Sequence, residues 1–275
     1  MKTLRVLCFI GLPTLVGLWF SRLWLRGRPS RLKIPSSPVV RHKQLVTDKR
    51  VFVIGDIHGC IDEFKLLLKK ADVDLRTTVV VLAGDVVNKG PDSIAALRYA
   101  RQIGALAVRG NNEEAVLRRV RTYYSGNKEL LPIERYRWIT GLTDDDVRWL
   151  ARLPFTISIP SMHAIVVHAG LIPNLPLEEQ SAETMVSARN VVTDSDGTMR
   201  STTSVSEGSP IGFVWPGPEL VCFGHDAKRR LQRHDFSIGL DTGCVYGDRL
   251  TGIYLDDLTK VYQVKAGKVY DKPAQ

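Results

Sequence analysis

Short apolar runs alternate with amphipathic stretches between residues 51 and 112. The runs VFVI, VVVLA and ALAV are each followed by a glycine and a cluster of Asp, His or Asn, in GDIHG, GDVVNKG and GNNE. Between the runs, residues 61–71 and 93–103 carry apolar side chains at helical spacing, and Pro91 precedes the second stretch. This order predicts a parallel sheet whose strands are joined by right-handed helical crossovers.

Polar clusters that follow parallel strands meet at the carboxyl edge of their sheet. The pattern therefore predicts that Asp56, His58, Asp85 and Asn111 point into one crevice, rather than acting only as turn and capping residues. Carboxylate oxygens and neutral imidazoles are suitable ligands for Zn, Mn, Fe or Co. One carboxylate can bridge two ions about 3.5–4 Å apart, so we expect a site for two divalent cations.

These blocks resemble the GDxHG, GDxxDRG and GNHE motifs of the calcineurin-like metallophosphoesterases, in the phosphoprotein phosphatase superfamily. The resemblance continues in order with VVHAGL and FGHD. It implies an α/β fold of four layers, in which two mixed β-sheets pack together between flanking helices. It also implies two metal sites that share Asp85. The implied ligands are Asp56, His58 and Asp85 for one ion, and Asp85, Asn111, His168 and His225 for the other.

Two residues differ from the protein serine/threonine phosphatases. By resemblance, Asn112 replaces a histidine that protonates the leaving group, and Asn88 replaces the aspartate that supports it. An amide does not titrate, so neither residue can act as a general acid. A serine alkoxide needs a proton as it leaves, whereas a departing phosphate is a weak base with a second pKa of about 6. The presence of asparagine at positions 88 and 112 therefore favours phosphoanhydride substrates.

The carboxyl third supports the same substrate class. LDTGCVYGDRLTG resembles a block of the ApaH-like phosphatases, and KGPDS and GHDAKRRLQ resemble their fungal and protist branch, which includes a zinc-dependent endopolyphosphatase. The resemblance implies that a hydroxide activated by two metal ions cleaves phosphoanhydrides such as inorganic polyphosphate or dinucleoside polyphosphates. A protein serine/threonine phosphatase that uses His163 or His234 as its acid is an alternative. An inactive metal-binding scaffold is a second alternative.

A polyanionic phosphate substrate needs cationic and polar contacts. By resemblance, Lys89 and Arg109 occupy phosphate-binding positions, although lysine is a point charge and lacks the fork of arginine. We expect Asp85, Lys89, Arg109 and Asn112 to be catalytic, and the last three to contact substrate. Lys228 and Arg229, beside His225, are further candidates for a long polyanion or belong to a solvated run of charge.

The net charge of +9 comes from the N-terminal segment. Residues 1–47 contain nine Lys and Arg and no acid, which leaves 38 − 9 = 29 basic residues against 29 acidic ones in the remainder. A neutral body does not indicate a dedicated nucleic-acid-binding face.

An uncharged apolar run extends from Val6 to Ser21 and is bordered by Trp and Arg. Snorkelling and interfacial side chains can complete this short span. We expect a basic leader with a membrane-anchor helix over residues 1–28, a linker over 29–47 and the catalytic domain over 48–270. Basic residues after the run favour a cytoplasmic body. The vacuole lumen and, given the acid-free leader, the mitochondrion are alternatives.

Several further segments carry weaker signals. TDDDVRWLARLP predicts a capped helix, and FTISIP with HAIVVHAGL predicts an antiparallel hairpin. Residues 193–210 lack apolar periodicity, which predicts a flexible surface excursion. Cys60 and Cys244 lie in glycine turns near the expected site and are interpreted as small buried residues.

Overall fold

The computed structural model describes residues 41–125 and 134–273. The leader, the anchor and most of the linker expected from the sequence lie outside these residues. Within them, no helix combines the length and the apolar character needed to cross a membrane.

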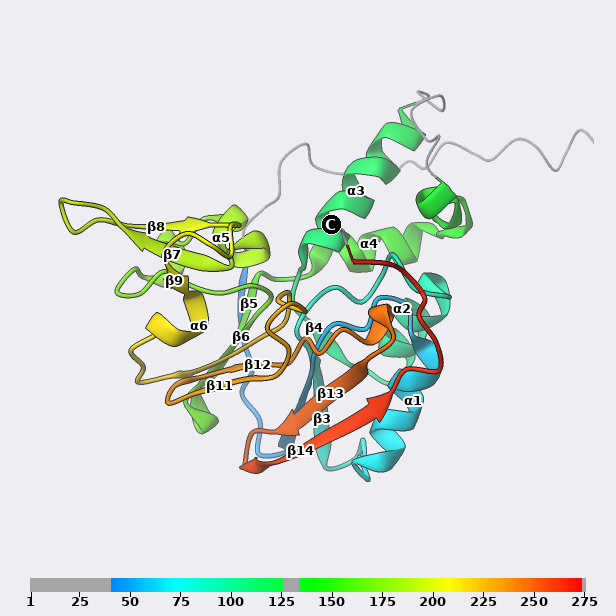
Figure 1. Cartoon of the computed structure of the whole chain (residues 1–275). Coiled ribbons are helices and arrows are strands. Elements are labelled where there is room, and N and C mark those ends of the chain that lie inside the picture. Colours follow the sequence, from blue (N-terminus) through cyan, green and yellow to red (C-terminus); the bar gives the residue numbers. More distant parts are fainter. Residues whose placement is uncertain (1–40, 126–133, 274–275) are drawn as a thin grey trace, which may run out of the picture. The chain divides into compact units, whose positions relative to one another are not determined.

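The predicted crossover motif forms the centre of a five-stranded mixed sheet (Figure 1). Its strands, in spatial order, are β14 (Asp257–Lys265), β13 (Arg249–Tyr254), β2 (Arg50–Ile54), β3 (Thr78–Leu82) and β4 (Leu106–Ala107). Helices α1 (Ile61–Lys70) and α2 (Ser93–Gln102) connect the three parallel strands β2, β3 and β4. β13 pairs antiparallel with both β2 and β14. The sequence prediction of parallel strands joined by two helices is confirmed.

A second mixed sheet has six strands. In spatial order they are β1 (His42–Gln44), β5 (Thr156–Ile159), β6 (Ala164–Val167), β10 (Leu220–Phe223), β12 (Ser237–Gly239) and β11 (Gln232–His234). The antiparallel pairing of β5 with β6 confirms the predicted hairpin. β1 pairs parallel with β5, so the end of the expected linker is part of the sheet and the prediction of a linker over residues 29–47 was wrong there.

The two sheets pack face to face. Alternate residues of β2 show why, because Val51 and Val53 join a buried cluster with Ile157 and Val166 of the other sheet. The intervening residues, such as Phe52, face a second cluster formed with α1 and α2. A strand covered on both faces has no polar side, which explains the unbroken apolar runs in the sequence.

Helices α3 (Asn111–Tyr124) and α4 (Asp144–Arg152) complete the helical layer. Thr143 caps α4, and its side chain accepts a hydrogen bond from the Asp146 backbone N–H. The Asp146 carboxylate also pairs with Arg98 and Arg101 of α2, which links the two helices. The short 3-10 helices are η2 (Glu134–Gly141), η3 (Pro160–Met162), η4 (Leu177–Glu179) and η5 (Cys244–Tyr246).

The segment predicted to be a flexible excursion instead forms a third sheet. Its strands are β7 (Asn190–Thr193), β8 (Met199–Thr202) and β9 (Ser209–Pro210), flanked by α5 (Ala182–Ser187) and α6 (Ile211–Val214). Of the residues in these three strands, only Asn190 and Val191 are buried. Val191 packs in a small cluster with Ala188 and Ile211. Strands of two to four residues with so little apolar surface leave no periodic signal, which is why the prediction was wrong.

Candidate metal centre and substrate pocket

The residues expected to bind metal follow the carboxyl ends of strands from both large sheets. Asp56 and His58 follow β2, and Asp85 follows β3. Asn111 begins α3 after β4. His168 and His225, from the other sheet, follow β6 and β10. The structure brings all six together.

Asp85 lies between two groups of ligands. Its Oδ2 is 3.5 Å from His58 Nε2, and its Oδ1 is 3.5 Å from His168 Nε2. On one side, Asp56 Oδ2 is 3.8 Å from His58 Nε2. On the other side, Asn111 Oδ1 is 3.0 Å from His168 Nε2 and 3.1 Å from His225 Nδ1. This geometry matches the two ligand sets that share Asp85.

Backbone carbonyls fix the orientation of the imidazoles. The nitrogens that point away from the centre are His58 Nδ1, His168 Nδ1 and His225 Nε2, which lie 3.4, 2.8 and 3.1 Å from carbonyl oxygens. An N–H that donates there leaves the other nitrogen of each ring with a lone pair directed at the centre. Metal-binding histidines are commonly held in this way.

Buried charges at the centre call for cations. Burial raises the pKa of Asp56 well above its usual value, and neighbouring Asp241 and Asp85 add to the effect. Burial lowers the pKa of His58 to about 3, so this imidazole is neutral at ordinary pH. Crowded carboxylates with neutral imidazoles fit two divalent cations, which would compensate the negative charge.

The ligand loops turn sharply. His58, Asp85 and His225 adopt left-handed backbone angles, with φ of 48°, 46° and 65°. Residues with side chains rarely adopt such angles, and they are concentrated at functional sites. Gly224 permits a close approach between the sheets, since a Cβ there would lie 2.0 Å from Asp56 Oδ1.

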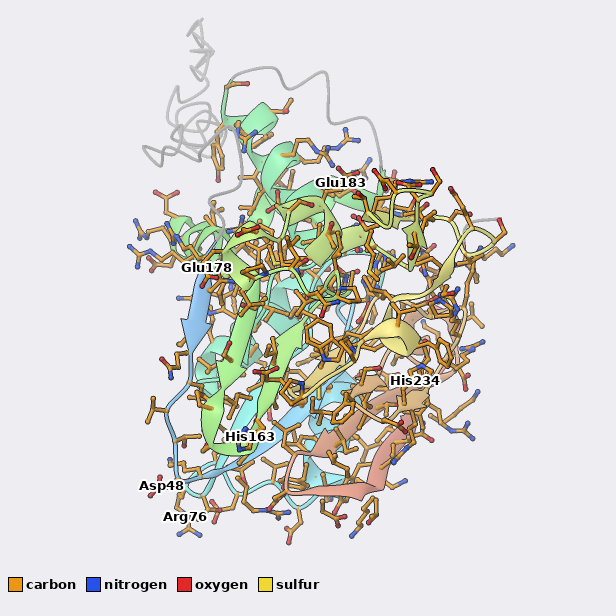
Figure 2. The ribbon with its side chains drawn as sticks, turned by 90° about the vertical axis from the view of Figure 1, so that its left-hand side faces the viewer. Asp48, Arg76, His163, Glu178, Glu183 and His234 are labelled. Atoms are coloured by element: carbon orange, nitrogen blue, oxygen red, sulfur yellow. The ribbon has the colours of Figure 1, made fainter. Side chains whose placement is uncertain are left out.

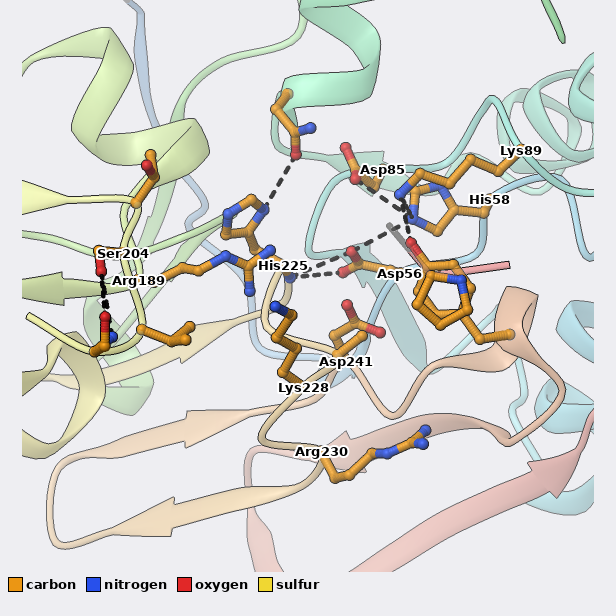
Figure 3. Close-up of a pocket in the computed structure, with 17 residues that line it drawn as sticks. Asp56, His58, Asp85, Lys89, Arg189, Ser204, His225, Lys228, Arg230 and Asp241 are labelled. Carbon is orange, nitrogen blue, oxygen red and sulfur yellow. Dashed lines mark hydrogen bonds and ion pairs between the residues drawn. The ribbon is translucent and has the colours of Figure 1, made fainter. Parts of the chain in front are cut away.

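A cavity of 590 Å³ opens above the metal ligands (Figure 3). Lys89, Arg189, Lys228 and Arg230 contribute its positive charge. The other lining residues are Asp56, His58, Asp85, Asn111, Thr203, Ser204, Val205, Ser206, His225, Ala227, Asp241, Tyr246 and Pro273. Metal ligands below and cations around the opening are suited to a phosphate-rich substrate.

A model of the calcineurin-like phosphoesterase family matches residues 49–229. The chain belongs to this family. It is 28% identical over 271 residues to the symmetrical bis(5'-nucleosyl)-tetraphosphatase of Aromatoleum aromaticum, covering 79% of this chain and 97% of that protein. For the Photorhabdus laumondii protein of the same name, identity is 26% over 261 residues, covering 75% and 94%. A crystal structure provisionally assigned as a diadenosine tetraphosphatase has 32% identity and a TM-score of 0.73, covering 83% and 99%.

Lys89 lies beside the predicted metal ligands of this phosphoesterase. Its Nζ lies 3.2 Å from His58 Nε2 and donates to the Tyr246 hydroxyl at 3.0 Å. Burial lowers the pKa of Lys89, but Asp85 and Tyr246 outweigh burial and leave the pKa above its usual value. Lys89 is therefore a charged ammonium at the bottom of the cavity, as expected for a phosphate contact.

Asn112 and Asn88 are buried beside Asp85. Asn112 Nδ2 donates to Asp85 Oδ2 at 2.5 Å, and Asn112 Oδ1 accepts from Asn88 Nδ2 at 2.8 Å. Both side chains lie outside the set that lines the cavity. In this structure Asn112 orients the shared carboxylate and accepts a hydrogen bond from Asn88, and its predicted contact with substrate stays a prediction.

Two predicted phosphate contacts are placed elsewhere. Arg109 is 4% exposed and donates to Glu114 at 2.7 Å and to the Ala151 carbonyl at 2.6 Å, so it fastens α3 to α4. Arg229 pairs with Asp226 and with Asn190 of β7. Neither side chain lines the cavity, and both have partners within the fold, so their contact with substrate stays a prediction that this structure does not favour. Lys228, in contrast, lines the cavity as predicted.

Glu113, Asp241 and Arg189 are among the residues of the site that sequence reasoning missed. Glu113 accepts hydrogen bonds from the backbone N–H groups of Asp85, Val86, Val87 and Gly110 at 2.9–3.2 Å, and so holds the Asp85 loop. Burial raises the pKa of Glu113 to about 8. Asp241 and Arg189 line the cavity. The only available signals were the Glu of the GNNE block and the Asp of the LDTG block, and none existed for Arg189.

The alternative acids lie away from the metal centre. His163 is an exposed turn residue between β5 and β6, and His234 ends β11 at the edge of the second sheet (Figure 2). Both lie outside the set of residues that line the cavity. Neither histidine is therefore placed to protonate an alkoxide leaving group in the cavity.

Proposed function

We propose that this phosphoesterase hydrolyses phosphoanhydride bonds in dinucleoside polyphosphates, inorganic polyphosphate or similar chains. The observation that carries the proposal is the Asn88–Asn112 pair beside Asp85. By resemblance the pair replaces the general acid and its supporting aspartate in the protein phosphatases, and an amide cannot serve as a general acid. An anhydride tolerates this because phosphate leaves as a weak base. Two relatives named tetraphosphatases support the same class of substrate.

Different residues of the site would have different roles in this reaction. When bound, two divalent cations (Zn, Mn, Fe or Co) supply the nucleophile and neutralise charge on the phosphoryl group. Asp85 is shared by the two ligand groups, while Asn112 and Glu113 hold it in place. Lys89 would bind an oxygen of the phosphate under attack, because its ammonium lies beside His58. Lys228 would bind phosphates farther along the chain.

A substrate panel tests the proposal. The full-length chain in detergent would be assayed separately with Zn, Mn, Co and Mg against diadenosine tetraphosphate, inorganic polyphosphate, capped RNA and a phosphoserine peptide. We expect kcat/KM for at least one anhydride to exceed that for the peptide by about 10²-fold or more, the low end of what a missing general acid costs. A preference for the peptide would contradict the proposal. No hydrolysis of any of the four substrates, with both metal ions bound, would favour an inactive scaffold.

We also propose that Val6–Ser21 anchors the chain in a membrane and leaves the body in the cytoplasm, which rests on sequence alone. The full-length chain should stay in the pellet after carbonate extraction. A chain that begins near residue 36, which keeps β1, should be soluble. Full-length chain in the soluble fraction would contradict the anchor. In cells whose plasma membrane is permeabilised with digitonin, protection of the body from added protease would contradict the cytoplasmic orientation.

A further inference from the structure

We infer that Cys60, Glu63 and Cys244 form a separate binding site for a soft divalent cation such as Zn²⁺. The three residues are buried, and their sulfur and carboxylate ligand atoms all lie within 4.8 Å of one another. None of the three belongs to the dinuclear centre or lines the cavity. The site does not depend on which substrate the enzyme cleaves.

The fold delivers these ligands from two loops. Cys60 is the N-cap of α1 and Glu63 is three residues later, so both face the same side of the first helical turn. Cys244 begins η5, which follows the left-handed Gly243. A tetrahedral zinc has bonds of about 2.3 Å to sulfur and about 2.1 Å to oxygen, which places its ligand atoms about 3.5–3.8 Å apart. Closing the cluster on an ion therefore needs a small contraction.

Glu63 provides the second, independent observation. Its Oε1 accepts hydrogen bonds from the Gly267 backbone N–H at 2.9 Å and from the Tyr270 hydroxyl at 2.7 Å. Its Oε2 is buried and has no hydrogen-bond partner among the described residues. Buried polar atoms are normally satisfied. A cation bound between Oε2 and the two sulfurs would satisfy this oxygen.

The chemistry of the donors selects the ion. Two sulfurs and one carboxylate favour Zn²⁺ over Mg²⁺ or Ca²⁺, which prefer oxygen ligands. Three protein ligands leave one tetrahedral position for a water or for Oε1 of Glu63.

An ion here would join the two loops beside Lys89. Cys60 is two residues after the metal ligand His58, and Cys244 is two residues before Tyr246, whose hydroxyl accepts from Lys89. The proposed ion would thus act as a structural cross-link that holds His58 and Tyr246 at a fixed separation. This role differs from that of the dinuclear centre, where the ligands are oxygen and nitrogen.

Cobalt substitution distinguishes the two kinds of site. Thiolate ligands give Co²⁺ a near-ultraviolet charge-transfer absorption that oxygen and nitrogen ligands do not give. The full-length chain, stripped of metal and reloaded with Co²⁺ under reducing conditions, should show this absorption. Cys60→Ser and Cys244→Ser should each lose most of it and bind about one ion fewer per chain. Cys222→Ser, which changes a buried cysteine of β10 outside the cluster, should keep both properties.

Two further variants separate this site from the dinuclear centre and from misfolding. Asp85→Asn should lose activity and retain the charge-transfer absorption. Glu63→Gln keeps both sulfurs, so it should retain the absorption but release Co²⁺ to a chelator more readily than wild type. Reloaded wild type without the absorption, although its dinuclear centre is filled, would overturn the inference. A Cys60–Cys244 disulfide in the purified chain, with no zinc released on its reduction, would also overturn it.

Discussion

The floor and the wall of the cavity are built differently. The floor consists of Lys89 and five predicted metal ligands that follow buried strands, namely Asp56, His58, Asp85, Asn111 and His225. Of these, Asp56 and Asp85 are 3% and 2% exposed. The wall consists of Arg189, residues 203–206, Lys228 and Arg230, from the third sheet and the loop after β10. Buried hydrogen bonds hold the floor, whereas exposed ion pairs, such as that between Arg230 and Asp248, hold parts of the wall.

This difference indicates that the floor carries out the reaction and that the wall determines which substrate binds. A buried ligand cannot relocate without leaving charges and polar groups unpaired, so the floor keeps one geometry. Exposed ion pairs contribute little and are screened by salt, so an exposed wall side chain such as Arg230 can exchange its partner for a substrate phosphate. We therefore expect changes in the floor to lower kcat, and changes in the wall to alter KM and the choice of substrate.

The largest effect is expected from Asp85→Asn. The substitution is nearly isosteric but removes the charge that both ligand groups share, so turnover should fall about 10³-fold or more while the fold survives. Steady-state kinetics, bound-metal analysis and thermal unfolding would be measured together. Asp74→Asn, at an exposed position, is the matched control. Activity above about a tenth of wild type with both metals bound would contradict the shared ligand.

Lys89→Met comes next and tests the cation of the floor. Removing a preorganised charge next to the reacting group should lower kcat about 10²-fold. Lys89→Arg should recover part of this loss, because charge returns but the guanidinium does not fit the ammonium contacts with His58 and Tyr246. A loss confined to KM for Lys89→Met would show that Lys89 acts only in binding.

Restoring the histidine and aspartate that Asn112 and Asn88 replace by resemblance tests the role of this pair. Asn88→Asp with Asn112→His should raise phosphopeptide hydrolysis relative to anhydride hydrolysis by about tenfold, below the full range for general acid catalysis. The gain is limited because Asn112 is hydrogen-bonded to Asp85 and is not among the residues that line the cavity. The single Asn112→His variant is the control. Equal gains on both substrates would contradict the proposal that the asparagine pair favours anhydride substrates.

Sequence reasoning predicted the floor better than the wall for a physical reason. Apolar runs such as Val51–Ile54 and the turns that follow them are local signals, and the parallel order of the strands places Asp56 beside Asp85. Arg109 shows the limit, because nothing local tells whether a guanidinium faces substrate or, as here, Glu114. The left-handed angles of the ligand residues and the paths of Arg189 and residues 203–206 depend on tertiary packing, which no sequence period records.

The smallest predicted effect belongs to Lys228→Ala in the wall. Lys228 lines the cavity and has no hydrogen bond or ion pair within the described part of the chain, so its ammonium is free to meet a phosphate. Its loss should raise KM for a long polyphosphate a few-fold at low salt, leave kcat unchanged, and have less effect at high salt, where screening already weakens the contact. Arg229→Ala is the comparison within the same loop: its guanidinium is held by Asp226, so it should act through stability and show no such salt dependence. A fall in kcat for Lys228→Ala would place this lysine with the floor, and an unchanged KM at low salt would remove it from the substrate path.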